Sequence, residues 1–383
     1  MTSTRPKAVA VLALGSLLAI TLSACGSSSG STGTAGTGGT GAAGGSTNQD
    51  AIDAAKSAVA DARKPISSFT APSAPAGPVP KGKLVSVVTA LNAAPLPYNV
   101  AKLSVAALES LGMKGEIIDG KGSPAGWDAA VRTALNGNTS AIIMSASEPS
   151  LIPQGAKAAA AKKVPFTTVF GCESPKPDNV SMEVPATREA EGKLLADWVM
   201  QDSPNGAEVI MQTNAQFFCL KGEGEAFKTE LAKGGSAFKV VEESEATPAD
   251  QAGAAATQKV AGLLRKHPDA HYFFSMQADW APAFEQGLAS VGRQDVTGLF
   301  ADYDQVLDLM RSKKNLVAAG PNVEANAWIG VYATIAALNG KQVPAMTAPI
   351  QLLDSQNLGT SGDPLKPGFD QTAAWKSFLE SGS

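Results

Sequence analysis

Polar and aromatic side chains follow several apolar runs of the sequence, at the points where predicted strands end. Aromatic rings can stack on the face of a ligand, while amides and carboxylates bond to its edge. This combination suits a polyhydroxyl compound or a polar ring of similar size. The residues of this kind are Asn92, Tyr98, Trp127, Gln216, Phe217, Gln277, Asp279, Trp280, Asp302 and Asn322.

Several of these residues also have a plainer interpretation as part of the fold. Tyr98, Trp127 and Trp280 stand in or near the first helical turn after a strand, where a side chain can face a cleft or enter the core. Asp302 could contact a ligand, or it could cap the helix predicted to begin near residue 305. The sequence leaves these alternatives open.

The sequence lacks the short motifs that carry much of enzymatic chemistry. No G-x-S-x-G follows a predicted strand, no G-x-x-x-x-G-K-[ST] phosphate loop is present, and no G-x-G-x-x-G opens the first helix. The two histidines, His267 and His271, flank a proline, and we interpret them as loop residues rather than zinc ligands. We therefore predict a binding protein that is not an enzyme and holds no metal and no cofactor.

The elements that position the polar residues alternate between strand and helix from residue 83 onward. Apolar runs typical of buried parallel strands cover 83–91, 114–120, 139–146 and 164–171, with helical patterns between them. A helix at 187–202 starts a second block, whose strands are predicted at 207–214, 238–246, 270–276, 296–303 and 316–322. A long helix follows at 325–340. Two such blocks predict an α/β protein with two lobes, each built on a parallel sheet.

The N-terminus has the layout of an export signal. Arg5 and Lys7 precede an uncharged apolar run that ends in Leu22-Ser23-Ala24-Cys25. The run resembles a bacterial lipoprotein signal, which implies that residues 1–24 are removed and that Cys25 carries diacylglycerol. The alternative is an ordinary secretory signal with a chance cysteine. Lipid chains hold a protein at a membrane because each buried methylene contributes about 0.8 kcal/mol.

A tether and a connector separate the signal from the predicted lobes. Residues 25–47 are rich in glycine, serine, threonine and alanine, and a chain of this kind spans roughly 25 Å. Residues 48–82 hold a predicted helix and a proline-rich connector. Ile52, Ala55, Val59 and Ala62 share one face of that helix, which could pack on the body or belong to the stalk.

Charge and cysteine content narrow the partners further. The net charge is −4 and no basic block occurs, so we predict no nucleic-acid partner. Besides Cys25, the chain has Cys172 and Cys219. An even pair in an exported protein can form a disulfide, and the sequence alone does not decide whether these two do.

From Lys83 to about Asn357 the chain resembles the type I periplasmic substrate-binding proteins of the ribose-binding group. The order and spacing of three stretches carry the resemblance: VVTALNAAPLPYNVAKLSVAALESLG, WDAAVRTALNGNTSAIIMSASEPS and the long segment from FFSMQADW to VAAGPN. It implies two Rossmann-like lobes joined by three crossovers at a hinge. The first lobe would hold 83–184 and 321–343, and the second 185–320 and 344–383.

The resemblance also assigns roles to the residues at the strand ends. It implies ligand contacts from Asn92 and Tyr98 in the first lobe and from Gln216 and Phe217 in the second. Residues 277–280 match the polar turn of the family, Asp302 matches its G-x-D aspartate, and Asn322 lies at the last crossover. Where the family often has Asp-Arg after the fourth strand, this chain has Gly-Cys-Glu. With fewer charged contacts, the solute could be more apolar or could present an aromatic face.

Three functions compete on this basis. We expect an extracytoplasmic, lipid-anchored, monomeric receptor that closes on a sugar or sugar-like solute and delivers it to an ABC importer. The second reading is a sensing lobe that signals to a membrane kinase or chemoreceptor, which the sequence cannot separate from the first. A cell-surface enzyme on the same scaffold is the third.

Overall fold

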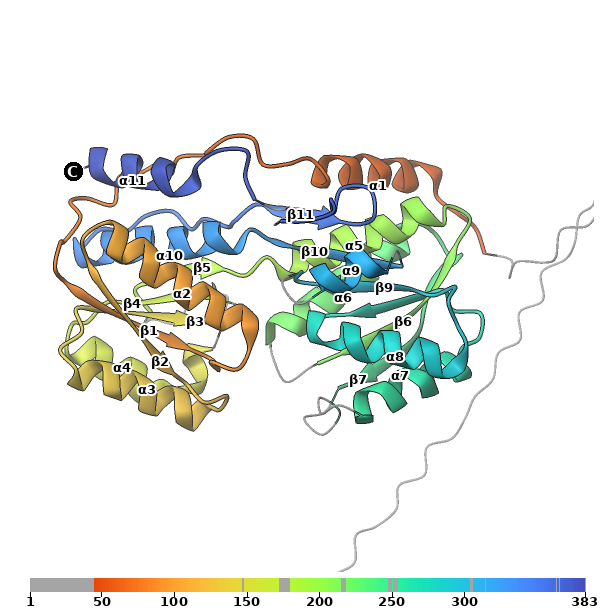
Figure 1. Ribbon diagram of the computed structural model, residues 1–383, viewed down its shortest axis with the longest axis horizontal. Helices are drawn as coiled ribbons and strands as arrows, with labels where there is room; N and C mark the ends of the chain where they lie inside the picture. Colours follow the sequence, from red (N-terminus) through yellow and green to blue (C-terminus); the bar gives the residue numbers. More distant parts are fainter. Residues whose placement is uncertain are drawn as a thin grey trace, which may run out of the picture. The chain divides into compact units, whose positions relative to one another are not determined.

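The structure is a computed structural model. It describes residues 45–146, 148–171, 180–214, 218–246, 250, 254–303, 306–313, 315–362, 364 and 366–382. These residues lie in one compact unit, Ala43–Ser383. Within that unit the chain forms two α/β lobes (Figure 1), so the predicted fold class is confirmed.

The first lobe is built on a parallel sheet with the strand order β2-β1-β3-β4-β5 among the described residues. Its strands are β1 (Leu84–Thr89), β2 (Lys114–Asp119), β3 (Ala141–Ser145), β4 (Phe166–Gly171) and β5 (Met182–Pro185). Helices cover both faces: α2 (Pro95–Ser110), α3 (Pro124–Asn136), the 3-10 turn η1 (Pro149–Leu151), α4 (Pro153–Ala161) and α10 (Val323–Leu338). A sheet covered on both faces explains why its strands read as continuous apolar runs.

Neighbouring residues of one strand enter two different cores in this lobe. Val87 packs in the cluster that contains α2 and α10, whereas Val88 packs with α3 and α4. Successive side chains of a strand point to opposite faces of the sheet, so both valines are fully buried. The first turn of α3 is fixed locally, because the Ser123 hydroxyl accepts a hydrogen bond from the Gly126 amide at 3.2 Å.

The second lobe has the strand order β11-β10-β9-β8-β6-β7 among the described residues. Its strands are β6 (Ala207–Thr213), β7 (Phe238–Glu245), β8 (Tyr272–Ser275), β9 (Thr297–Ala301), β10 (Leu316–Pro321) and β11 (Ile350–Leu353). The edge strand β11 runs antiparallel to β10, so the predicted parallel arrangement holds for the other strand pairs of this sheet and not for this one. The helices are α5 (Arg188–Asp202), α6 (Phe218–Lys233), α7 (Ala254–Lys266), the 3-10 turn η2 (Ala278–Trp280), α8 (Ala281–Val291) and α9 (Leu307–Ser312).

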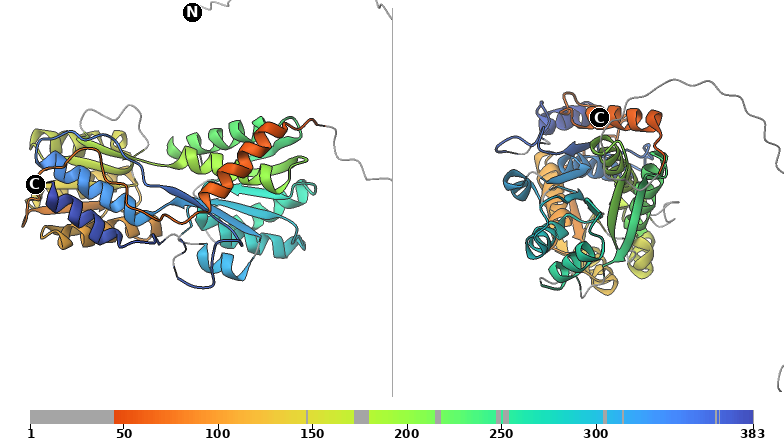
Figure 2. Two further views of the ribbon diagram at one scale, coloured as in Figure 1. Left: turned by 90° about the horizontal axis from the view of Figure 1, so that it is seen from above. Right: turned by 90° about the vertical axis from the view of Figure 1, so that its right-hand side faces the viewer.

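The chain passes between the lobes at the three places that the resemblance implies. It runs from β5 directly into α5, from β10 into α10, and from α10 back to β11. The segments at both ends of the chain cross as well. The N-terminal helix α1 (Gln49–Ala62) packs on α5, and the connector that follows leads to β1 in the first lobe. The C-terminal helix α11 (Gln371–Ser381) lies beside α10 (Figure 2).

The predicted helix near residues 48–63 is confirmed, and it packs on the body. Ile52, Ala55 and Val59 are its buried residues, and they join the core beneath α5. At the end of α1, Arg63 pairs with the buried Asp354 carboxylate, which also accepts a hydrogen bond from the Trp198 indole at 2.9 Å. These contacts hold the start of the connector on the second lobe.

The C-terminal tail divides between the two lobes. Its strand β11 joins the second sheet, as expected for residues 344–383, but α11 does not stay with that lobe. Trp375 stacks on Trp328 of α10 with ring centroids 6.2 Å apart, and it meets Phe69 of the connector edge-on at 5.0 Å. The assignment of the whole tail to the second lobe therefore differs from the structure. The aromatic contacts of α11 account for the difference.

Candidate functional site

The carboxyl ends of the parallel strands in each lobe carry the predicted polar residues. In the first lobe, the Thr89 hydroxyl donates to the Asn92 side-chain oxygen at 2.6 Å. The backbone N–H of Asn92 donates to the Asp119 carboxylate at 3.0 Å. Backbone donation from Lys121 and from Asn92 lowers the pKa of Asp119. This network orients Asn92 at the end of β1.

A second network of amides lies at the ends of β6 and β8. The Asn214 amide donates to the Gln277 side-chain oxygen at 2.9 Å. Below them, the buried Ser275 hydroxyl donates to the Gln212 side chain and holds the end of β8 against β6. No residue in the described part of the chain accepts from the Gln277 side-chain N–H groups, which could therefore donate to a solute.

The most strongly charged group in this region surrounds Arg188, in the first turn of α5. Its guanidinium lies 2.6 Å from the Asp302 carboxylate, 3.4 Å from Glu191 and 3.8 Å from Glu223. Neither carboxyl oxygen of Glu223 has a hydrogen-bond partner among the described residues. One buried cation thus faces three carboxyl groups.

The pKa values of the two buried glutamates in this cluster are raised. Burial, opposed by the attraction of Arg188, raises the pKa of Glu191 to about 7. Burial also raises the pKa of Glu223 well above its ordinary range. The cluster therefore holds protons near neutral pH, because a second and third buried negative charge would not be compensated.

Asp279 is a further acidic residue of this region, and it is exposed to solvent. Its side chain is accessible, yet the surrounding protein atoms raise its pKa, and the nearby Asp302 carboxylate adds to the effect. An acid that stays accessible among so many protein atoms fits a position inside a cleft. The second lobe thus presents amides and carboxyl groups, with the largely buried Arg188 as their counter-charge.

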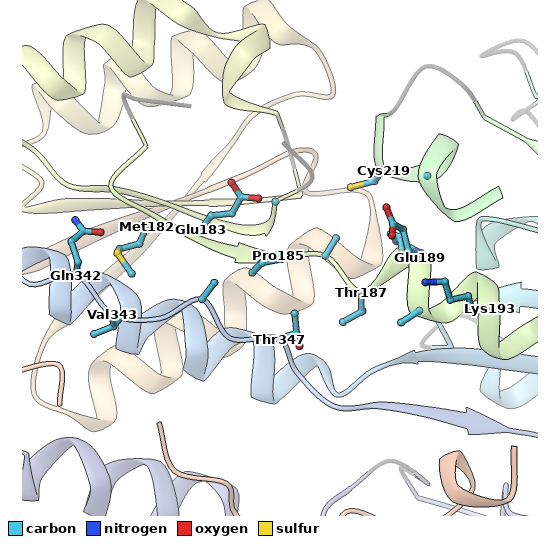
Figure 3. Close-up of a pocket in the computed structure, with 16 residues that line it drawn as sticks. Met182, Glu183, Pro185, Thr187, Glu189, Lys193, Cys219, Gln342, Val343 and Thr347 are labelled. Atoms are coloured by element: carbon cyan, nitrogen blue, oxygen red, sulfur yellow. The ribbon is translucent and has the colours of Figure 1, made fainter. Parts of the chain in front are cut away.

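A cavity of about 630 Å³ lies between the lobes beside two of the crossovers. It is bounded by Gly171, by β5 and by the start of α5 and α6, with the segment after α10 on the remaining side. Figure 3 shows Glu183 and Cys219 on one side and Gln342, Val343 and Thr347 on the other. Arg188 also lines this space. Its volume falls within the range of small-molecule sites.

The structure buries two of the predicted aromatic contacts. Trp127 is 4% exposed, and its indole N–H donates to the Ala90 carbonyl at 2.8 Å. Trp280 is 2% exposed and packs in the core beside α8. In this arrangement neither indole is accessible to a solute, so the core interpretation describes their positions. A ligand role for either stays a prediction.

The other predicted contacts are more dispersed. Tyr98 is half-buried, with the Lys102 ammonium 5.0 Å from its ring centroid. Asn322 is buried and caps α10, since its side-chain oxygen accepts from the Ala325 amide at 2.7 Å. Neither is among the residues that line the cavity of Figure 3. Four predictions fall outside the described residues: Cys25, Cys172, Gln216 and Phe217.

Two features of this region bear on the earlier predictions. Cys219 is disulfide-bonded, and its predicted pairing with Cys172 stays a prediction. The sequence patterns gave no prediction for Arg188, Glu191 or Glu223. The only local signal is the sequence TREAEG, which reads as an ordinary polar helix start. Among the described residues, no cluster of histidine, cysteine, aspartate or glutamate could hold a metal ion.

The sequence model of the periplasmic binding protein domain matches residues 99–342. The chain belongs to the periplasmic binding protein family. That match covers most of both lobes, and it confirms the predicted resemblance and the prediction of a solute-binding protein rather than an enzyme. Members of this family work outside the cytoplasm. No curated protein sequence matches the chain significantly.

Solved structures share the fold of this periplasmic binding protein at low sequence identity. The 5-methylthioribose transporter solute-binding protein of Thermotoga lettingae, solved with 5-methylthioribose, is 17% identical with a TM-score of 0.67, covering 82% of this chain and 100% of its own. An ABC transporter solute-binding protein of Mycobacterium smegmatis with bound glycerol is also 17% identical, with a TM-score of 0.63 and coverage of 72% and 96%. A glucose-galactose binding protein of Geobacillus stearothermophilus is 17% identical, with a TM-score of 0.62 and coverage of 73% and 99%.

These neighbours establish the fold of the periplasmic binding protein and leave its solute open, because their identity to it is below 20%. They also cover their own chains almost completely. The residues of this chain that they do not cover therefore lie outside the fold that the proteins share. In the described part of the chain, no helix has the length and apolar character needed to cross a membrane.

Proposed function

We propose that this chain is an extracytoplasmic, lipid-anchored solute-binding protein that captures a sugar or sugar-like solute and delivers it to an ABC importer. The observation that carries the proposal is the cavity of about 630 Å³ between two lobes of a periplasmic binding protein. The solved neighbours include proteins with a bound sugar derivative or a polyol. Hydroxyl groups of such a solute would bond to polar and charged side chains of the cavity lining, among them Arg188, Lys193 and Gln342.

Binding would favour the closed arrangement of the lobes. A solute that touches both lobes has more contacts when they are closed, and it shifts the population by that difference in affinity. Asn92 in the first lobe, and Gln277 and Asp302 in the second, do not line the cavity of Figure 3, and they would add polar contacts to the solute when the lobes close. The importer would then recognise the closed protein.

Isothermal titration calorimetry tests the solute class. The probes are D-galactose, L-arabinose, allitol and 5-methylthioribose, and we expect at least one to bind. The variant Gln277→Ala should weaken that binding about tenfold, since it leaves a polar group of the solute unpaired. Gln286→Ala is the matched control, because Gln286 lies exposed on α8 and should leave the affinity unchanged. Equal loss in both variants would remove Gln277 from the site.

The lipid anchor and the importer need separate tests. Metabolic labelling with an alkyne-bearing fatty acid should mark the wild-type protein, and Cys25→Ser should abolish the label and release the protein from the membrane. Deletion of the cognate permease should stop uptake of the bound solute. Binding that persists while uptake is unaffected by that deletion would favour the sensing reading instead.

We further propose that the partner of Cys219 is Cys172. The chain has three cysteines, and lipidation of Cys25 would leave these two. The bond would join the residue after β4 in the first lobe to α6 in the second, close to the crossovers. Peptide mapping without reduction should recover one linked peptide containing both cysteines. A free thiol at Cys172 would contradict the pairing.

A further inference from the structure

Arg188 stands where the hinge meets the second lobe. It is the first residue of α5, and the crossover from Pro185 at the end of β5 leads directly into it. Its side chain is 12% exposed, and it lines the cavity between the lobes. A change at Arg188 therefore acts on the hinge and on the solute cavity at once.

The three acidic partners of Arg188 differ in exposure. The side chains of Glu191 and Glu223 are completely buried, and they lie 3.4 and 3.8 Å from the guanidinium. Asp302 is 15% exposed and makes the shortest contact, 2.6 Å from Nη2. The two glutamates thus hold the guanidinium from the buried side. Its closest bond is directed to the aspartate at the end of β9.

Asp302 adopts a backbone conformation that its surroundings must maintain. Its φ is +66°, in the left-handed region that few residues other than glycine adopt. Its amide donates to the Ala319 carbonyl at 2.9 Å. The absence of a side chain at Gly320 makes room for the Asp302 backbone, because a Cβ on Gly320 would lie 3.2 Å from the Asp302 Cα. Strain of this kind persists where neighbouring contacts fix it, and it gathers at functional sites.

We propose that Arg188 is a positioning residue for solute binding: it aims the Asp302 carboxylate at the solute and ties that carboxylate to the crossover between the lobes. The inference rests on the proposed function, because it takes Asp302 as a solute contact. It differs from a direct contact by Arg188 in one measurable way. Loss of the guanidinium should weaken binding only while Asp302 keeps its carboxylate.

A double-mutant cycle on the full mature chain tests this coupling. Calorimetry with the four probes named above gives the affinity of the wild type, Arg188→Gln, Asp302→Asn and the double variant. We expect Arg188→Gln to weaken binding about tenfold, the usual size of a lost charge-assisted hydrogen bond. In the Asp302→Asn background the same change should alter affinity less than about twofold. Arg188→Lys keeps the charge and should recover part of the loss.

The matched control is Arg63→Gln. Arg63 forms a similarly buried pair with Asp354, but it directly follows α1 and does not line the cavity. Arg63→Gln should lower the Tm and leave the affinity for the solute unchanged.

Equal effects of Arg188→Gln on affinity in both backgrounds would overturn the inference while the proposed function stands. Loss of affinity in Arg63→Gln would also overturn it. Should Arg188→Gln fail to fold, Arg188→Lys carries the same cycle. If no probe binds the wild type, the proposed function falls and takes the inference with it.

Discussion

The buried carboxyl of Glu191 makes stability depend on pH in a way that one substitution can remove. Burial raises its pKa to about 7 from an ordinary value of 4.5. Between these values the folded protein holds a proton that the unfolded chain has released. Stability is therefore greatest below pH 4.5 as far as this group is concerned, and it falls as pH rises towards 7.

The size of the effect follows from the separation of the two pKa values. Each unit is worth about 1.4 kcal/mol, so a separation of 7 − 4.5 = 2.5 units corresponds to about 3 kcal/mol. Glu191→Gln removes the titration and keeps an acceptor for the Thr187 hydroxyl, which lies 2.5 Å from the carboxylate. The variant should therefore gain about 2–3 kcal/mol relative to the wild type as the pH rises from 5 to 8.

Urea unfolding at pH 5, 6, 7 and 8 measures this gain. The difference in unfolding free energy between Glu191→Gln and the wild type should change mainly between pH 5 and 7 and level off towards pH 8. Glu189→Gln, on the exposed face of the same helix, is the control and should run parallel to the wild type. Parallel curves for wild type and Glu191→Gln would show that the buried carboxyl does not change its charge between pH 5 and 8, and would refute the reasoning.

Three further predictions concern the stability of the folded chain, two through side-chain packing and one through a buried ion pair. Trp375→Ala should cost about 3–5 kcal/mol of unfolding free energy in urea, because Trp375 is 3% exposed within an aromatic cluster; a loss below about 1 kcal/mol would contradict the packing of α11 on α10. Gly330→Ala would place a Cβ 2.5 Å from the Val169 side chain, so its Tm should fall by the equivalent of about 1–3 kcal/mol; an unchanged Tm would contradict that contact. Asp354→Asn should cost about 3 kcal/mol in urea by leaving Arg63 unpaired, whereas Asp61→Asn on an exposed pair should cost under about 1 kcal/mol; equal losses would contradict the buried pair.

The alternation of long apolar and amphipathic segments is enough to predict most of the fold. The strand at 84–89 and the helix at 323–338 stand out because each carries one unbroken pattern. The short strands β5 and β11 do not, since four residues show too little periodicity. They become strands by pairing with β4 and β10. That pairing depends on tertiary contacts, which local patterns do not contain.

The site was harder to predict than the fold. Position after a strand drew attention to Asn92, Gln277 and Asp302, whose contact with a solute stays a prediction, but it could not show which way a side chain points. Trp280 follows a strand as predicted and yet enters the core. The significance of Arg188 depends on Asp302, 114 positions away in the sequence. Only the folded chain brings them together.

Ligand-dependent closure of the two lobes is the central claim, and small-angle X-ray scattering of the mature protein tests it most directly. The measurement compares the radius of gyration without solute and with a probe that calorimetry shows to bind. The account predicts a smaller radius when the probe is bound. Identical scattering profiles with and without a bound probe would contradict closure.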